Sequence, residues 1–251
     1  MAQYFFLGSC FSVEISQRLK DYAQSNSLEI EVLANPFGTL FAPSAIADTL
    51  SIIANEQEPI LTKVNQQFHC LTFASKFQSE QELELSETIH SLISSSAHFI
   101  KHTQKAIITL GTAWVYEYIP ENLLVGNCHR IPNHQFRKRL LSFSEIVENL
   151  KQCISSLKSI HPEIQIDFTI SPVRHLRDGL IENSISKSIL RVAIHEIISQ
   201  FTDIGYFPAF EIFNEELRDK SYFREDLAHP NNTAINIIFQ KWLEHERMGI
   251  H

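Results

Sequence analysis

The segment that sets the fold is Tyr4–Ser12, which reads YFFLGSCFS in a chain of 251 residues. Its apolar first part, Tyr4–Leu7, is typical of a buried strand, and Ser12–Ser25 has the pattern of a helix. Gly8 and Ser9 connect the two, and a glycine lets the backbone turn sharply because it has no Cβ. We therefore expect a strand that passes through a tight turn directly into a helix.

Short apolar runs and helical patterns alternate along the rest of the chain, which predicts βαβ units around a parallel sheet. Further strands are expected at residues 29–34, 106–110, 164–170 and 206–212. The run at 106–110 is continuously apolar, as in a strand buried on both faces, whereas the alternation in 164–170 favours one less covered face. Helices are expected at 43–54, after a Ser79/Glu82 capping box, after a Ser142/Glu145 capping box, around 185–197 and at 232–244.

Two stretches, Ile60–Phe73 and Trp114–Pro132, fit no strand–helix unit. The second is expected to form a hairpin, with Pro120-Glu121-Asn122 at its turn. Proline and glycine are spread thinly, and no repeat or linker is visible. We therefore expect a single domain over residues 1–251, with inserted loops or ribbons near 60–75 and 114–140 lying over an active site.

The composition is that of an ordinary globular protein, with 44% hydrophobic and 20% charged residues. The net charge of −8 disfavours nucleic acid as a partner, because phosphates require a basic surface. The basic run Arg137-Lys138-Arg139 is too short to change this and is expected to be solvated. No run of about 18 apolar residues is present, so no membrane insertion is expected.

The four cysteines are Cys10, Cys70, Cys128 and Cys153, and none has the spacing of a zinc site or a C-x-x-C pair. They favour a reducing, cytoplasmic location, without a metal or another cofactor. Residues 7–10 weakly resemble a lipoprotein cleavage site. A signal peptide needs a basic start and an apolar stretch of about 7–15 residues, so that reading is rejected.

Ser9 is the first candidate for chemistry. It stands where the first strand ends and the first helix begins, and in open α/β sheets functional sites lie at the carboxyl ends of strands. The free N–H groups and dipole of the helix start favour a developing negative charge there. The alternative is that Ser9 is only a helix cap, a role for which serine is also favoured.

The second candidate is the Asp226-Leu227-Ala228-His229 sequence just before the final expected helix. This spacing can place a carboxylate and an imidazole on one side of a turn. The carboxylate would then orient the imidazole, which would take the serine proton. The alternative is a loop histidine beside a solvated aspartate.

Two turns that contain glycine follow other strands, one with Gly38 and one with Gly111-Thr112. Acyl transfer needs donors aimed at an oxyanion, and the N–H groups of Ser9 and Gly38 are candidates. Other residues at strand ends have open roles. Arg174 and His175 are candidate substrate contacts. Arg174 would bind an anionic group of the substrate, and the alternative is that it forms a salt bridge to an acidic neighbour.

Trp114 either stacks on a substrate or lies in the core. Cys10 is a minor alternative nucleophile, whose pKa the helix start is expected to lower. Glu211 is expected near Asp226 as a supporting residue. None of these assignments follows from its residue type alone.

The ordered motifs make the sequence similar to the GSCFA family, a branch of the SGNH (GDSL-type) hydrolases and acyl-esterases. The resemblance covers nearly the whole chain. Its motifs are Gly8–Phe11 (with Ser12 in place of the final alanine), Asn35–Gly38, Thr109–Trp114, Asn127–His129, Ser171–His175, Tyr206–Glu211 and Asp226–Pro230.

The resemblance implies a three-layer α/β/α, flavodoxin-like fold with a central parallel sheet of about five strands. It also implies Ser9 as nucleophile, His229 as general base, Asp226 as its orienting carboxylate and Gly38 as an oxyanion donor. Ala113 stands where SGNH enzymes carry an oxyanion asparagine. Thr112, Asn35 and Asn127 are the alternatives for that third donor, and Asn35 is also a candidate substrate contact.

The expected function is that of a serine esterase or acyltransferase acting on a small-molecule or carbohydrate ester, such as a sugar O-acetyl group. The alternative is a non-catalytic carbohydrate- or lipid-binding module on the same fold, because a fold does not fix a function. The sequence does not specify an oligomeric state.

Overall fold

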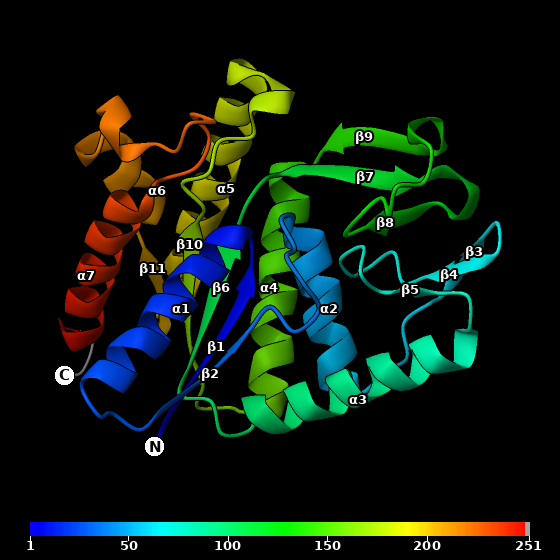
Figure 1. Cartoon of the computed structure of the whole chain (residues 1–251), viewed down its shortest axis with the longest axis horizontal. Helices are drawn as coiled ribbons and strands as arrows, with labels where there is room; N and C mark the ends of the chain where they lie inside the picture. Colours follow the sequence, from blue (N-terminus) through cyan, green and yellow to red (C-terminus); the bar gives the residue numbers. More distant parts are fainter. Residues whose placement is uncertain (249–251) are drawn as a thin grey trace.

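The computed structural model describes residues 1–248 and is built around a five-stranded parallel sheet (Figure 1). The strand order is β2-β1-β6-β10-β11, which is the order of flavodoxin-like folds and confirms the predicted fold class. The strands are β1 (Ala2–Gly8), β2 (Ile30–Ala34), β6 (Lys105–Leu110), β10 (Gln165–Ile170) and β11 (Ile204–Phe207). The first strand is longer than its four apolar residues indicated.

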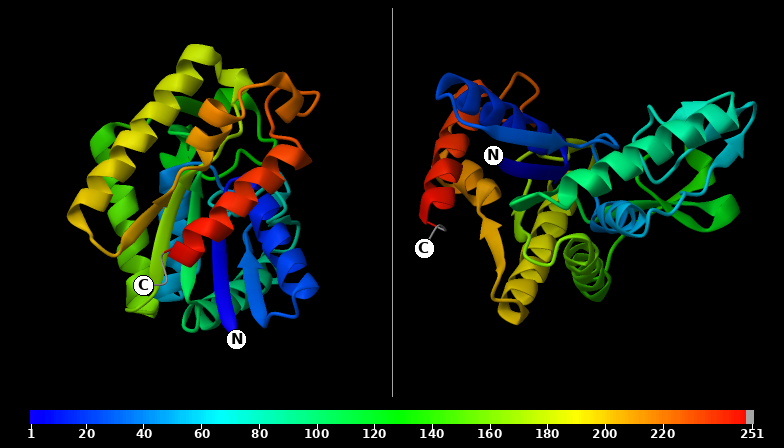
Figure 2. Two further views of the ribbon diagram at one scale, coloured as in Figure 1. Left: turned by 90° about the vertical axis from the view of Figure 1, so that its left-hand side faces the viewer. Right: turned by 90° about the horizontal axis from the view of Figure 1, so that it is seen from below.

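Helices cover both faces of this sheet (Figure 2). One layer contains α1 (Cys10–Ser25) and α7 (Asn232–Met248), whose apolar side chains pack with Phe6 and Ile107 from the sheet. The other contains α2 (Pro43–Asn55), α3 (Glu82–Ile100), α4 (Phe143–Ile160) and α5 (Leu180–Gln200), which enclose Phe5, Leu7 and Ile108. The alternation of side chains along β1 and β6 thus supplies one core to each layer.

Two small antiparallel sheets are inserted between these units. The first contains β3 (Thr62–Val64), β4 (Gln67–His69) and β5 (Gln78–Ser79), and the second contains β7 (Trp114–Tyr118), β8 (Leu123–Val125) and β9 (Phe136–Leu140). The predicted hairpin is confirmed, since β7 pairs with β8 and Asn122 takes a left-handed conformation at the turn. Both sheets lie on the α2–α3 side of the molecule (Figure 1).

Three local predictions are wrong for identifiable reasons. The fifth strand ends at Phe207, because Pro208 has no N–H to continue the ladder, and residues 209–216 form short helices instead. Ser79 does not form a capping box with Glu82, since it belongs to β5 and α3 begins at Glu82 behind Gln81. Residues 166–170 of β10 are all buried, so neither face is less covered.

The order of the strands determines where a site can form. The connections from β1 to β2 and from β2 to β6 leave on opposite faces of the sheet, so the strand order reverses beside β1. Ligands bind at such a switch point, outside the carboxyl ends of the strands. Ser9 follows β1 at this position. No helix in the described part of the chain is long and apolar enough to cross a membrane.

Candidate active site

The turn after β1 is set by the close approach of β1 and β6. Gly8 has a φ of +139°, and a Cβ at this position would lie 2.1 Å from Thr109 O. Only glycine therefore fits without moving one of the strands. The N–H of Ser9 donates to the same oxygen at 3.0 Å and extends the ladder by one residue.

Ser9 is the N-cap of α1, so the capping alternative correctly describes its structural role. Its Oγ accepts a hydrogen bond from Phe11 N at 3.3 Å, and only 1% of the residue is exposed. Asn35 fixes the turn from the neighbouring strand, because its Oδ1 accepts from Gly8 N at 2.8 Å and its Nδ2 donates to Ser9 O at 3.4 Å. The amide of Asn35 is thus engaged within the protein rather than directed at a ligand.

Asp226 and His229 form the pair that the D-x-x-H spacing indicated. Asp226 Oδ2 lies 2.6 Å from His229 Nδ1, while Oδ1 accepts from the backbone N–H groups of Ala228 and His229 at 2.9 and 3.0 Å. The hydrogen bonds from these two backbone groups, His229 first, lower the pKa of the Asp226 carboxyl to about 2. The carboxylate is therefore ionised at neutral pH and holds the imidazole by its Nδ1, which leaves Nε2 available.

The backbone conformation and hydrogen bonds of this loop hold Asp226 and His229 in place. Leu227 takes a φ of 54°, which is uncommon for a residue with a side chain. Arg224 N donates to His229 O at 2.8 Å, and Arg174 N donates to Ala228 O at 3.0 Å. The loop is thus fixed on both sides of His229.

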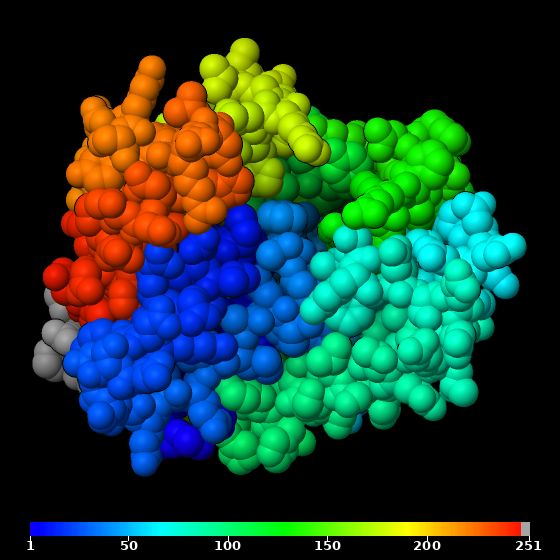
Figure 3. All heavy atoms as spheres, viewed as in Figure 1, coloured from blue at the N-terminus to red at the C-terminus, as the bar shows by residue number. Residues whose placement is uncertain are grey.

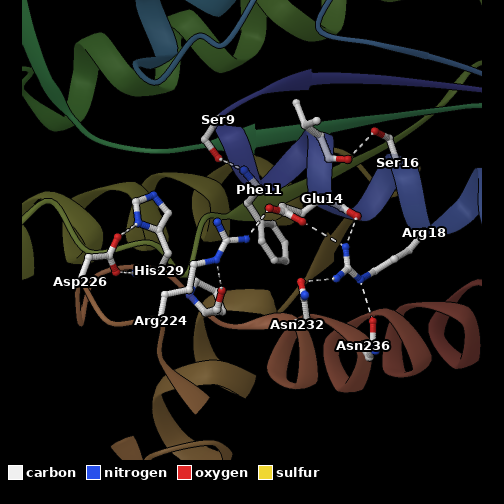
Figure 4. A network of polar contacts seen from close by, with 12 residues as sticks. Ser9, Phe11, Glu14, Ser16, Arg18, Arg224, Asp226, His229, Asn232 and Asn236 are labelled. Atoms are coloured by element: carbon white, nitrogen blue, oxygen red, sulfur yellow. Dashed lines mark hydrogen bonds and ion pairs between the residues drawn. The ribbon is translucent and has the colours of Figure 1, made fainter. Parts of the chain in front are cut away.

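A polar network joins this loop and α7 to α1 (Figure 4). Arg224 donates to the Glu14 carboxylate at 2.6 Å and to Pro230 O at 3.1 Å. Glu14 also pairs with Arg18, which donates in turn to two asparagines of α7, Asn232 and Asn236. The first helix and the segment around His229 accordingly lie against each other on the surface (Figure 3).

Ser9 and the Asp226–His229 pair thus come to the same edge of the sheet. Figure 4 shows the His229 ring directed toward the Ser9 turn. A small cavity of about 100 Å³ lies between α1 and the loop, with Cys10 and His229 in its wall. No hydrogen bond joins Ser9 Oγ to His229 among the described residues.

The predicted oxyanion donors reach this edge, but their N–H groups are engaged. Gly38 N donates to Asn35 O at 2.8 Å and Thr112 N donates to Phe41 O at 3.1 Å. Gly38 has a φ of +79°, and a Cβ there would lie 2.3 Å from the side chain of Ala74, so a glycine is required. The Thr112 hydroxyl contacts Ser186 Oγ at 3.0 Å and accepts from Trp114 N.

Trp114 and Arg174, two of the candidate substrate contacts, have different surroundings. Trp114 is half-exposed rather than in the core, and its ring lies under Lys138 while Nε1 donates to Glu182 O on α5. The Arg174 guanidinium stacks on Phe223 with 4.2 Å to the ring centroid, and no described carboxylate pairs with it, so the salt-bridge alternative is wrong.

His175 is packed edge-on against Phe41. Burial first, and then the charge of Lys187, lower the pKa of the His175 imidazole to about 4. The ring is therefore neutral at physiological pH. It is a candidate hydrogen-bonding group rather than a cation.

The predictions for Cys10 and Glu211 are wrong. Burial, and then Glu14, raise the pKa of the Cys10 thiol, so the helix start does not lower it as predicted. Glu211 does not support Asp226, because its carboxylate binds Tyr206 and Arg191 on another part of the surface.

Glu14, Arg18 and Arg224 were not predicted from the sequence, and neither was Lys187, whose ammonium is buried at this edge of the sheet. The pairing of Glu14 with Arg18 at positions i and i+4 is visible in a helical pattern. No local signal indicates their partners, which follow more than 200 residues later.

One described group of side chains has a metal-like arrangement, Asp167, His245 and Glu246. It lies at the opposite edge of the sheet. Lys105 Nζ already occupies it, with oxygens of Asp167 and Glu246 at 3.1 and 2.8 Å. A metal ion would have to displace this ammonium, so the group is better described as a buried salt bridge.

If Asp226 orients His229 as the sequence predicts, Asp226→Asn is expected to lower kcat by about ten-thousandfold, the scale of the same change in a Ser-His-Asp triad. An asparagine can retain the contacts to Ala228 N and His229 N, but its amide favours the tautomer with the proton on Nε2, which cannot accept a proton from serine. Ester turnover and thermal unfolding measured together check this. Loss of activity with unchanged melting supports the role, whereas full activity contradicts it.

The comparisons with known proteins agree with this fold. The chain matches the GSCFA family over residues 3–242. No curated protein matches it in sequence. An acetyl xylan esterase from the rumen bacterium Butyrivibrio proteoclasticus has a similar structure, with a TM-score of 0.53 and 10% identity over 99% of this chain and 64% of that one.

A protein from Parabacteroides merdae described as a GDSL-like lipase is also similar, with a TM-score of 0.51 and 12% identity over 97% of this chain and 94% of that one. At these identities the likeness concerns the fold alone. The family match spans nearly the whole chain and includes both the Ser9 turn and the Asp226–His229 loop. The chain belongs to the GSCFA family.

Proposed function

We propose that this protein is a serine ester hydrolase or acyltransferase in which Ser9, His229 and Asp226 act together. The observation that carries the proposal is the 2.6 Å contact between Asp226 and His229 Nδ1, on a loop tied to the helix that Ser9 caps. A histidine held this way by an ionised carboxylate is a general base, and a serine at the start of a helix is its natural partner.

In the proposed reaction, His229 Nε2 takes the hydroxyl proton as Ser9 Oγ bonds to the acyl carbon. The resulting tetrahedral adduct collapses, and the alcohol leaves with that proton, so that the acyl group remains on Ser9. A water molecule or a sugar hydroxyl then gives its proton to His229 and attacks the acyl carbon. Departure of Ser9 Oγ, which regains the proton, completes the cycle.

The proposed oxyanion contacts come from the N–H groups of Ser9 and Gly38, the donors predicted from the sequence. Both donate to protein carbonyls in the described state, those of Thr109 and Asn35. Binding an oxyanion through them requires an exchange of acceptors when the substrate enters. The negative charge therefore needs a second source of stabilisation.

The cavity beside Cys10 and His229 is small, which supports a small acyl group in the proposed reaction. About 100 Å³ is well below the roughly 300–1,000 Å³ of pockets that enclose drug-sized ligands. The walls contributed by Phe11, Val173 and Ile235 are apolar. An acetyl ester of a carbohydrate is the substrate class that we propose, in line with the acetyl xylan esterase of similar fold.

A fluorophosphonate probe tests the function, because it forms a covalent bond with an activated serine. Wild-type protein is expected to be labelled at Ser9, as located by peptide mass spectrometry, and Ser9→Ala should not be labelled. Ser16→Ala is the matched control, since Ser16 is also buried on α1 but hydrogen-bonds only to Val13 O. Absence of labelling together with tight sugar or lipid binding would favour the binding module.

A further inference from the structure

Lys187 is a buried cation at the same edge of the sheet as Ser9. It lies on α5 with 2% of the residue exposed. Its Nζ donates to Gly111 O at 2.6 Å and to Ser171 O at 2.7 Å. These carbonyls directly follow β6 and β10, so the ammonium is fixed between the carboxyl ends of two central strands.

No carboxylate neutralises this ammonium among the side chains that the structure describes. The titratable groups that face it are the thiol of Cys10, from α1, and the imidazole of His175, from the segment after β10. The ring of Phe210 lies 5.8 Å from Nζ. Lys105 of β6, the other buried lysine among the described residues, has two carboxylate partners, whereas Lys187 of α5 has none.

A buried charge without a counter-ion is costly, and an anion that binds or forms beside it would offset that cost. Two of the three ammonium hydrogens satisfy carbonyls, and the third is not committed. Meanwhile the backbone donors at this edge are occupied, including Ala113 N, which donates to Ser186 Oγ at 2.7 Å. Lys187 is thus a buried positive charge at this edge of the sheet that has a hydrogen to spare for an anion.

We propose that Lys187 is a positioning residue of this site, which holds the ends of β6 and β10 and stabilises the negative charge that develops beside the Ser9–Cys10 turn. The proposal rests on the proposed function. It gives the buried ammonium the role of counter-ion to the tetrahedral adduct, alongside the N–H groups of Ser9 and Gly38, which donate to protein carbonyls until an oxyanion takes the place of these acceptors.

The charge state of Lys187 provides a distinctive test. Burial lowers the pKa of its ammonium to about 7. As the pH rises above this value, the free protein loses the proton and with it the stabilisation of the adduct, so kcat/KM is expected to fall on the alkaline side. An anion formed at Ser9 favours the ammonium and should raise the pKa.

The first experiment compares pH profiles of kcat/KM for p-nitrophenyl acetate. Lys187→Met is expected to be at least about tenfold slower than wild type near pH 6 and to lack the alkaline decline. Ser186→Ala is the matched control, because Ser186 anchors the same Gly111–Ala113 segment without a charge. It should retain the wild-type shape of the profile, whatever its rate. Identical profile shapes in wild type and Lys187→Met would overturn the proposal.

The second experiment follows Lys187 itself by NMR in wild-type protein made with 13C-labelled lysine. Its signal is identified by a midpoint near neutral pH, well below that of an ordinary lysine. Methylboronic acid forms a tetrahedral, negatively charged adduct when Ser9 Oγ bonds to boron and the hydroxyl proton leaves. Saturation with this probe is expected to raise the Lys187 midpoint by about one pH unit or more.

The outcomes separate the two proposals. A midpoint that stays near pH 7 with boronate bound overturns the role of Lys187 and leaves the ester-cleaving function standing. Equal boronate binding by wild type and Ser9→Ala overturns the function, and the role of Lys187 falls with it. This titration needs no variant at position 187, so it is decisive even if Lys187→Met does not fold.

Discussion

Replacing Ser9 with alanine is expected to reduce kcat/KM for p-nitrophenyl acetate by at least about a thousandfold, because the variant lacks the hydroxyl on which the proposed acyl intermediate forms. His229→Ala should cause a loss of similar size. The double variant should be only slightly slower than either single one, since residues that act as one unit have strongly non-additive effects. Steady-state kinetics of the four proteins give this comparison.

The control for Ser9→Ala has to account for the loss of a helix cap, which costs about 1 kcal/mol of folding free energy. Ser142→Ala provides it, because Ser142 caps α4 through a complete capping box with Glu145 away from the candidate site. Both variants should lose comparable stability in urea, and only Ser9→Ala should lose activity. Retained turnover in Ser9→Ala would exclude Ser9 as the nucleophile.

Gly8→Ala is expected to be the most damaging single methyl addition at the turn, with a loss of at least about 3 kcal/mol in the free energy of unfolding. The new Cβ would lie 2.1 Å from Thr109 O, a backbone atom of the central strand, and the φ of +139° is unfavourable for alanine. Relief of the clash requires β1 and β6 to separate where Ser9 N bonds to Thr109 O.

Gly179→Ala is the matched comparison for this prediction. It also has a positive φ, of +92°, but the atom nearest to its added Cβ belongs to the flexible Glu182 side chain. Urea unfolding should therefore show a loss of only about 1 kcal/mol for Gly179→Ala. Equal midpoints for the two variants would show that the contact between β1 and β6 is not tight.

The layers and the parallel sheet could be predicted from the sequence because each depends on a local period. The run at 106–110 is apolar apart from Thr109, and it forms a strand that is buried on both faces. The fifth strand was placed too far along the chain because Tyr206–Ile212 is apolar beyond the point where Pro208 ends the ladder. Such an error arises where a backbone hydrogen bond, rather than hydrophobicity, determines the boundary.

The candidate site could be predicted only in part. Ser9 and the Asp226–His229 pair lie in short motifs whose chemistry is visible in the residue types. Lys187 was missed because its neighbours Ser186 and Ser188 give a helical pattern in which a lysine is normally solvated. Its burial depends on how α5 packs over two strand ends, and a single sequence does not encode that placement in any local pattern.

The hydrogen bonds from Arg18 of α1 to Asn232 and Asn236 of α7 have a consequence for folding during synthesis on the ribosome. A nascent chain that has emerged only as far as β11 already contains the hydroxyl of Ser9, but it lacks both the imidazole and the Asn232 and Asn236 amides that receive Arg18. The face of the central sheet that carries Phe6 and Ile107 lacks the apolar side chains of α7 until those later residues are made. Completion of this hydrophobic layer and the proposed meeting of Ser9 with His229 therefore both depend on the C-terminal segment, so a partly made chain is expected to lack the proposed activity.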